Sequence, residues 1–389
     1  MLINPALAAT PAPPVMEARR WLEGVAFTPE QPLLNLSQAA PVLPPPAPLQ
    51  EAMVAALADP ATHVYGPVLG LPALRAALAM RMTEIYGGTI DAAQIAITSG
   101  CNQAFCAAIA TLASPGDGII LPVPWYFNHA MWLTQQGIIP QPLPCGPDML
   151  PCPEQAARLI TSRTRAIVLV TPNNPTGVEY PPELITAFRD MARAHGLALI
   201  LDETYRDFHA SPDAPHDLFT DPDWEDVVIH LYSFSKAYRL TGHRVGAVAT
   251  SPARLREIEK FLDCVTICPT GLGQRAALWG LENLRDWLAG ERAEILHRRA
   301  ALATAFDALN GWDLRSSGAY FGYAAHPFAQ DSETLARHLV RKAGVLVLPG
   351  SMFGPQGDTQ GARHLRIAFA NADSAGIAEL AKRLANLDL

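Results

Sequence analysis

Short apolar runs that alternate with helical segments restrict the fold of this chain more than any other feature. The runs at 166–170, 197–201 and 227–232 read AIVLV, LALIL and VVIHLY. Runs of this kind are typical of strands buried on both faces of a parallel sheet. Between the first two lies 181–196, PPELITAFRDMARAHG, which has the apolar spacing of a helix. Strands that alternate with helices predict an α/β fold with a doubly wound, mostly parallel sheet.

The two ends of the chain differ from this central pattern. The first 48 residues are rich in proline and alanine, which favours extended chain apart from a short helix around 15–24. The C-terminal part mixes helices with short strands such as 318–325 and 364–370. We therefore predict a large domain at 49–284 and a smaller α+β domain made of 1–48 and 285–389.

The composition limits the partners that we expect. Apolar residues make up 49% of the chain and charged residues 17%, and the formal charge is −8 without a basic run. We therefore expect neither nucleic acid nor an anionic membrane surface as a partner. No apolar segment approaches the roughly 20 residues that span a bilayer, and we find no secretory signal. The six cysteines form no C-x-x-C pair, so we expect reduced thiols, no metal site and a cytoplasmic location.

Polar residues follow four of the predicted strands at the point where each strand ends. In a doubly wound sheet, ligands bind outside the carboxyl ends of the strands, so these residues should face one crevice. Each residue alone has a structural explanation, such as a turn, a helix cap or a solvated lysine. The combination indicates a ligand. The residues are Ser99, Gly100, Cys101 and Asn102 after 94–98, Asn173 and Asn174 after 166–170, Asp202 and Tyr205 after 197–201, and Ser233, Ser235 and Lys236 after 227–232.

The chemical groups in this set describe one ligand. A phosphate would be held by the amides of the helix that follows the first of these strands, by the two serines and by Arg244. The carboxylate of Asp202 suits a protonated ring nitrogen, while Asn174 and Tyr205 suit a ring oxygen. Burial and nearby cations would lower the pKa of Lys236, so that its amine would form an imine with an aldehyde. Phosphate, pyridine nitrogen, phenolic oxygen and aldehyde together describe pyridoxal 5′-phosphate.

The motifs and their order resemble a known family. The chain is similar to the class I and II aminotransferases of the aspartate aminotransferase superfamily, which are pyridoxal-phosphate-dependent enzymes of fold type I. The resemblance extends from Tyr65 to Arg366, and S-x-S-K followed by G-x-R-x-G is its most specific part. It implies a seven-stranded sheet and a homodimer with shared active sites. The segments that carry it are YGPVLGLPALR, TSGCNQA, PWYFNH, TPNNPTG, LDETY, SFSKAYRLTGHRVG and LRIAFA.

The resemblance implies a role for each residue that binds the cofactor. Lys236 resembles the lysine that forms a Schiff base with the cofactor and later moves the substrate proton. Asp202 resembles the partner of the ring nitrogen. Asn174 and Tyr205 resemble the partners of the ring oxygen. The implied phosphate ligands are Gly100, Cys101, Asn102, Ser233, Ser235 and Arg244, with Tyr65 contributed by the partner subunit.

At the substrate end, the chain both follows the family and departs from it. Arg366 resembles the arginine that binds the substrate α-carboxylate, because its planar fork allows two parallel hydrogen bonds, and Asn174 is expected beside it. Ala39 stands where relatives usually have a glycine, so its methyl group would narrow the substrate pocket. Relatives specific for dicarboxylates have a second arginine in the region of Thr270, whereas the next arginine here is Arg275. Aspartate is therefore not favoured as the donor.

Three alternatives stay open from the sequence. Tyr126 resembles the aromatic residue stacked on the cofactor ring, and Trp125 is the competing residue. The same fold and lysine also serve lyases, of the β-eliminating C–S lyase or cyclopropane-forming synthase type. A remote alternative is a non-catalytic regulator that binds the cofactor. We predict an aminotransferase that moves an amino group from an L-amino acid to a 2-oxo acid by a ping-pong mechanism.

Overall fold

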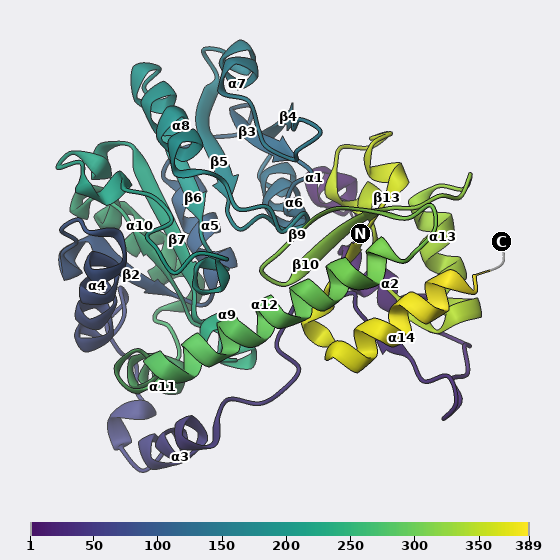
Figure 1. Cartoon of the computed structure of the whole chain (residues 1–389). Coiled ribbons are helices and arrows are strands. Elements are labelled where there is room, and N and C mark those ends of the chain that lie inside the picture. The colour runs from purple at the N-terminus through teal and green to yellow at the C-terminus, as the bar shows by residue number, and fades with distance from the viewer. Residues whose placement is uncertain (1, 388–389) are drawn as a thin grey trace.

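A seven-stranded sheet forms the centre of the larger part of the molecule in the computed structural model, which describes residues 2–387 (Figure 1). Its strands run parallel except β8, which lies antiparallel between β2 and β7. The predicted mostly parallel α/β sheet is thereby confirmed. The order across the sheet is β2 (Ile95–Thr98), β8 (Gly246–Ala249), β7 (Val228–Ser233), β6 (Ala198–Asp202), β5 (Thr164–Val170), β3 (Gly118–Val123) and β4 (Ile139–Pro144).

Helices cover both faces of this sheet. Along β6, Leu199 and Leu201 belong to one buried cluster and Ile200 to the other, because successive side chains of a strand point to opposite faces. The apolar side chains of each strand therefore pack into a buried cluster on one face of the sheet or the other. The helices of this part are α3 (Ala47–Ala56), α4 (Pro72–Tyr86), α5 (Cys101–Ala110), α6 (Phe127–Gln135), α7 (Pro153–Leu159), α8 (Pro182–Ala194), α9 (Phe234–Ala237), α10 (Pro252–Thr266) and α11 (Gly271–Asn283).

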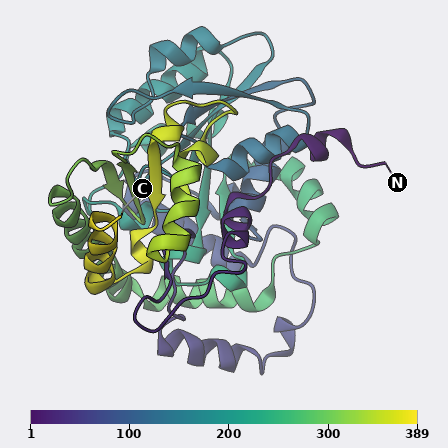
Figure 2. The ribbon, with the colours of Figure 1, turned by 90° about the vertical axis from the view of Figure 1, so that its right-hand side faces the viewer.

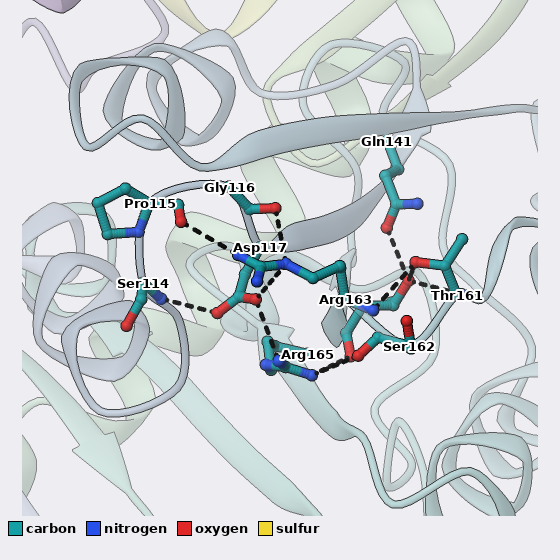
Figure 3. A network of polar contacts seen from close by, with 10 residues as sticks. Ser114, Pro115, Gly116, Asp117, Gln141, Thr161, Ser162, Arg163 and Arg165 are labelled. Atoms are coloured by element: carbon teal, nitrogen blue, oxygen red, sulfur yellow. Dashed lines mark hydrogen bonds and ion pairs between the residues drawn. The ribbon is translucent and has the colours of Figure 1, made fainter.

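The amino-terminal ends of β3 and β5 are tied together by a buried carboxylate (Figure 3). Asp117 precedes β3, and its Oδ1 lies 3.2 Å from Arg163 Nε and 3.1 Å from Arg165 Nη2. Its other oxygen accepts a hydrogen bond from the Ser114 amide at 3.0 Å. The two arginines neutralise the carboxylate and thereby connect β3 and β5 at this end of the sheet. Ligands bind at the opposite end of a parallel sheet, outside the carboxyl ends of its strands.

The C-terminal part builds a second, antiparallel sheet. Its order is β12 (Leu348–Pro349), β13 (His364–Ile367), β10 (Phe321–Ala325) and β9 (Asp313–Gly318), and its helices are α12 (Arg285–Asp307), α13 (Ser332–His338) and α14 (Ser374–Ala385). The sequence predicts a single strand at 318–325. The structure instead has a turn between β9 and β10, where Ala319 has a φ of 44°. β9 is a polar strand, which an apolar pattern does not reveal.

The N-terminal segment lies against this C-terminal part (Figures 1 and 2). After the helices α1 (Pro5–Ala9) and α2 (Pro14–Arg20), β1 (Leu34–Asn35) pairs in parallel with β11 (Val345–Leu346). The pairing supports a smaller unit built from both ends of the chain. The boundaries at 48/49 and 284/285 stay a prediction.

The two sheets meet closely at a pair of glycines. A Cβ added at Gly177 would lie 2.6 Å from the Gly318 carbonyl oxygen, and one at Gly318 would clash with the Gly177 carbonyl. Beside them, Ser316 Oγ donates to the Thr176 carbonyl at 2.8 Å. The loop after β5 is thus held directly against the β9–β10 turn, which fixes the second sheet relative to the first.

Candidate active site

A cavity of about 420 Å³ opens at the carboxyl ends of the parallel strands. Its size is that of a small-molecule site. The loops after β2, β3, β5, β6 and β7 all contribute to its walls, as does β13 of the second sheet. Of the residues singled out in the sequence, the lining includes Ala39, Cys101, Asn102, Tyr126, Asn174, Asp202, Tyr205, Ser233, Ser235, Lys236, Arg244 and Arg366.

Lys236 lies in the short helix α9, directly after β7. Ser233 begins this helix, because its Oγ accepts a hydrogen bond from the Ser235 amide at 3.3 Å. Lys236 is among the residues that line the cavity. Burial lowers the pKa of Lys236 from 10.5 to about 8, and the charges of Arg244 and Arg366 act in the same direction. A substantial neutral fraction near physiological pH makes this amine a nucleophile and a base.

Asp202 is the buried carboxylate at the base of the cavity. Its Oδ2 lies 3.3 Å from His129 Nε2, and its Oδ1 accepts hydrogen bonds from the Thr204 amide at 3.0 Å and the Cys101 thiol at 3.6 Å. Burial alone would raise the pKa of Asp202, but the contacts with His129 and Thr204 hold it below its usual value. Asp202 is therefore an ionised group in the wall of the cavity.

The start of α5 and Arg244 form a second polar corner of the cavity. Gly100 begins the helix with a φ of 87°, a conformation that favours glycine. A Cβ at this position would clash with Arg244 Nη2. Arg244 Nη1 donates to the Thr241 carbonyl at 3.0 Å and reaches Ser235 Oγ at 3.5 Å. Free helix amides, a hydroxyl and a guanidinium at one point are the donors that a phosphate requires.

Two tyrosines line the walls between these corners. Tyr126 donates to Asn102 Oδ1 at 3.3 Å and accepts from Asn128 Nδ2 at 2.8 Å. Burial raises the pKa of Tyr126 to about 12 and that of Tyr205 well above its usual value, so both phenols stay protonated. Trp125 does not line the cavity, and its amide is bonded to the Phe353 carbonyl at 2.8 Å. The geometry favours Tyr126 over Trp125 as the stacking residue.

Arg366 projects from β13 into the same cavity. Its Nη1 donates to Asn174 Oδ1 at 3.1 Å and its Nη2 to the Ser37 carbonyl, while Nε is buried without a partner. Phe353 and Phe321 flank the guanidinium at 4.9 and 5.3 Å. Burial lowers the pKa of Arg366 to about 10, so it stays charged at neutral pH. A buried cation paired only with neutral groups is suited to an incoming carboxylate.

Three residues that the sequence relates to substrate or subunit contacts, Tyr65, Thr270 and Arg275, do not line the cavity. Tyr65 is 77% exposed and does not line the cavity of its own chain. Thr270 Oγ1 donates to the His243 carbonyl at 3.2 Å, and Arg275 lies 2.8 Å from Asp59. Within residues 2–387, no three His, Cys, Asp or Glu side chains are grouped to hold a metal ion, and no helix is long and apolar enough to cross a membrane.

The sequence did not single out His129, Ser37 or Arg19, although all three contribute to the site. His129 ends the motif PWYFNH, and its position three residues after Tyr126 on one helix is a signal that could have identified it. Ser37 acts through its main-chain carbonyl, which leaves no side-chain pattern. Arg19 lines the cavity from the N-terminal helix α2, far from every motif.

These donors fit pyridoxal 5′-phosphate. The cavity joins a phosphate corner whose space depends on the missing Cβ of Gly100, an ionised carboxylate and a lysine of lowered pKa. The charges are complementary, because the phosphate corner is cationic and Asp202 suits a protonated ring nitrogen. The fold and the site together define a pyridoxal-phosphate-dependent enzyme of fold type I.

Comparison with known proteins gives the family. The model of the family described as aminotransferase class I and II matches residues 31–384. The chain therefore belongs to the class I and II aminotransferases, whose members use pyridoxal phosphate as cofactor.

Individual relatives agree with this assignment. The chain is 30% identical over 354 residues to a probable aspartate/prephenate aminotransferase of Thermus aquaticus, with 88% of both chains covered. It is 31% identical over 343 residues to an arginine–pyruvate transaminase of Pseudomonas aeruginosa, covering 87% of this chain and 85% of that one. The structure of Thermus thermophilus aspartate aminotransferase with maleate matches with a TM-score of 0.88 and 26% identity over 99% of each chain. The protein is a pyridoxal-phosphate-dependent aminotransferase, and the names of its relatives differ in the amino donor.

Proposed function

We propose that this aminotransferase moves an amino group from an L-amino acid to a 2-oxo acid in two half-reactions, with Lys236 as the reacting lysine. The observation that carries the proposal is that Lys236, Asp202 and Arg366 line one cavity. A base of lowered pKa thus shares a small space with a carboxylate for the cofactor ring and a guanidinium for the substrate.

The cofactor would be held by residues at both ends of the cavity. Bound pyridoxal phosphate supplies an aldehyde and an electron-withdrawing ring. Asp202, oriented by His129, would hold the proton on the ring nitrogen. Arg244 and the amides at the start of α5 would hold the phosphate, and Tyr205 and Asn174 would bind the ring oxygen.

The substrate would be held by Arg366 and deprotonated by Lys236. Arg366 would bind the α-carboxylate, which would give its free Nε a partner. Lys236 Nζ would remove the proton from the donor Cα and, in the reverse half-reaction, deliver it to the Cα of the acceptor. Both groups act on the same substrate atom or its neighbour, which is consistent with their places in one cavity.

We further propose a cytoplasmic homodimer with shared active sites. The exposed apolar side chains of α3, of the loop that carries Tyr65 and of α10 include Val54, Val64 and Val265, at 70, 66 and 59% exposure. The loop that carries Tyr65 is joined to the end of α10 by a hydrogen bond from the Gly66 amide to Cys268 Sγ at 3.4 Å. A second copy covering this region would bring Tyr65 to the phosphate of its partner's cofactor.

The proposed reaction is tested by supplying the purified enzyme with single amino acids, with and without a 2-oxo acid. Transamination requires that catalytic release of the donor's 2-oxo acid depends on the added acceptor. Ammonia and pyruvate formed continuously without an acceptor would show a β-eliminating lyase instead. The same assay with Lys236→Ala should show no turnover.

A further inference from the structure

A fourth cationic side chain lines the cavity besides Lys236, Arg244 and Arg366. It is Arg19, at the end of the helix α2, which contributes to the cavity together with Met16. The N-terminal segment reaches this position by running from α1, beside α6, to α2 (Figure 2). Arg19 is exposed at the cavity mouth.

Arg19 and Arg366 hold two successive residues of one segment. Arg366 donates to the Ser37 carbonyl, and Arg19 Nη2 donates to Gln38 Oε1 at 2.6 Å. The segment is itself fixed, because Asn371 Nδ2 donates to the Gln38 carbonyl at 2.5 Å. Both guanidinium groups therefore line one cavity and bond to adjacent residues of the same segment.

Arg19 has no carboxylate partner among residues 2–387. The nearest acidic residue in sequence, Glu17, is engaged by Arg20 at 3.0 Å and by Arg337 at 3.3 Å. The only acidic residue of the cavity lining is Asp202, which is paired with His129. Arg19 is thus bonded to one neutral amide, and most of its five N–H donors are free for a ligand.

We propose that Arg19 binds the side-chain carboxylate of an acidic amino donor whose α-carboxylate is bound by Arg366. The proposal rests on the proposed function, since it names the substrate class of the same site. Relatives specific for dicarboxylates have a second arginine in the region of Thr270, and Arg19 of the N-terminal helix would take its role here. The preferred substrates are accordingly dicarboxylic amino acids and their 2-oxo acids.

The test compares L-glutamate with L-methionine, which has a similar length but no side-chain charge. Arg19→Gln should lower kcat/KM for glutamate about tenfold, mainly through KM, because Arg19 is exposed to competing water. The value for methionine should change less than twofold. Arg19→Lys should retain part of the glutamate activity. Arg20→Gln is the matched control, because Arg20 is the exposed neighbour outside the cavity lining.

Binding of non-reacting acids supplies a second measurement. Calorimetry should show that Arg19→Gln weakens succinate binding about tenfold and leaves butyrate binding unchanged. Equal losses for glutamate and methionine, no loss for either, or a wild-type enzyme that prefers methionine more than tenfold would each overturn the proposal. If the wild-type enzyme transaminates neither these nor other amino acids, the proposed function itself fails, which is a different result.

Discussion

Arg366 Nη1 donates a hydrogen bond to Asn174 Oδ1 at 3.1 Å, joining the second sheet to the loop after β5 of the first. The same loop is pressed against the β9–β10 turn through Gly177 and Gly318. Arg366 and the loop that carries Asn174 are therefore held in fixed positions relative to each other. We propose that recognition of the α-carboxylate and placement of the cofactor both depend on these two contacts.

Substitution of Arg366 should affect substrate binding more than folding. Arg366→Lys keeps the charge but cannot make the two parallel hydrogen bonds of a guanidinium. We expect kcat/KM to fall roughly 10- to 100-fold for every amino donor, mostly through KM, as for loss of a charge-assisted hydrogen bond. Steady-state kinetics checks this, with Arg315→Lys on the exposed face of β9 as control. An unchanged KM would show that another group binds the α-carboxylate.

His129 should act as a positioning residue for Asp202. Removing its contact at 3.3 Å in His129→Ala leaves one oxygen of the buried carboxylate without its partner. We expect the pKa of Asp202 to rise and the affinity of the apoprotein for pyridoxal phosphate to fall about tenfold. His129→Gln, which retains a donor, should recover most of the affinity in a fluorescence titration. If alanine and glutamine behave alike, the hydrogen bond has no part in cofactor binding.

The rate at which the apoprotein captures its cofactor should follow the pKa of Lys236. Only the neutral amine attacks an aldehyde, so the rate should rise with pH and level off near pH 8 rather than near 10.5. The lowered pKa also affects the stability of the apoprotein. The lysine binds its proton more tightly in the unfolded chain, so the contribution of this group to the free energy of unfolding rises as pH increases from about 8 to 10.5. Stopped-flow absorbance across pH checks the rate. A rise that continues through pH 10 would contradict the lowered pKa.

The glycine contact between the sheets should tolerate no side chain. Gly318→Ala would drive its methyl group into the Gly177 carbonyl. We expect a loss of about 1–3 kcal/mol in the free energy of unfolding and a raised KM, because Arg366 and Asn174 would be displaced. Gly290→Ala in α12, where a Cβ meets open space, is the control and should be neutral or stabilising. Urea unfolding compares the two variants, and equal stabilities would disprove the contact.

Much of the fold and about half of the residues that line the cavity could be predicted from the sequence, because both depend on local patterns. The buried strands β5, β6 and β7 are mostly apolar, and candidate ligand-binding residues such as Asp202 and Lys236 lie at or directly after the ends of strands. The polar strand β9 could not be predicted, since its residues carry no apolar alternation. Contacts between segments that are distant in the sequence could not be predicted either.

The N-terminal contribution to the site is the clearest example of this limit. Arg19 lines the cavity and the Ser37 carbonyl accepts a hydrogen bond from Arg366, while the pairing of β1 with β11 holds the N-terminal segment against the second sheet. No motif marks either residue in the sequence. The sequence does not favour an acidic amino donor, because it has no arginine near Thr270. Arg19, which lines the cavity from α2, makes such a donor a candidate again.

The most direct test of the account is to locate the lysine that bonds to the cofactor. The enzyme loaded with pyridoxal phosphate is reduced with borohydride, digested and mapped by mass spectrometry. We predict a modified peptide that contains Lys236, loss of that label in Lys236→Ala, and no label on Lys260, Lys342 or Lys382. A stoichiometric label on one of those three lysines, or an unchanged label in Lys236→Ala, would contradict it.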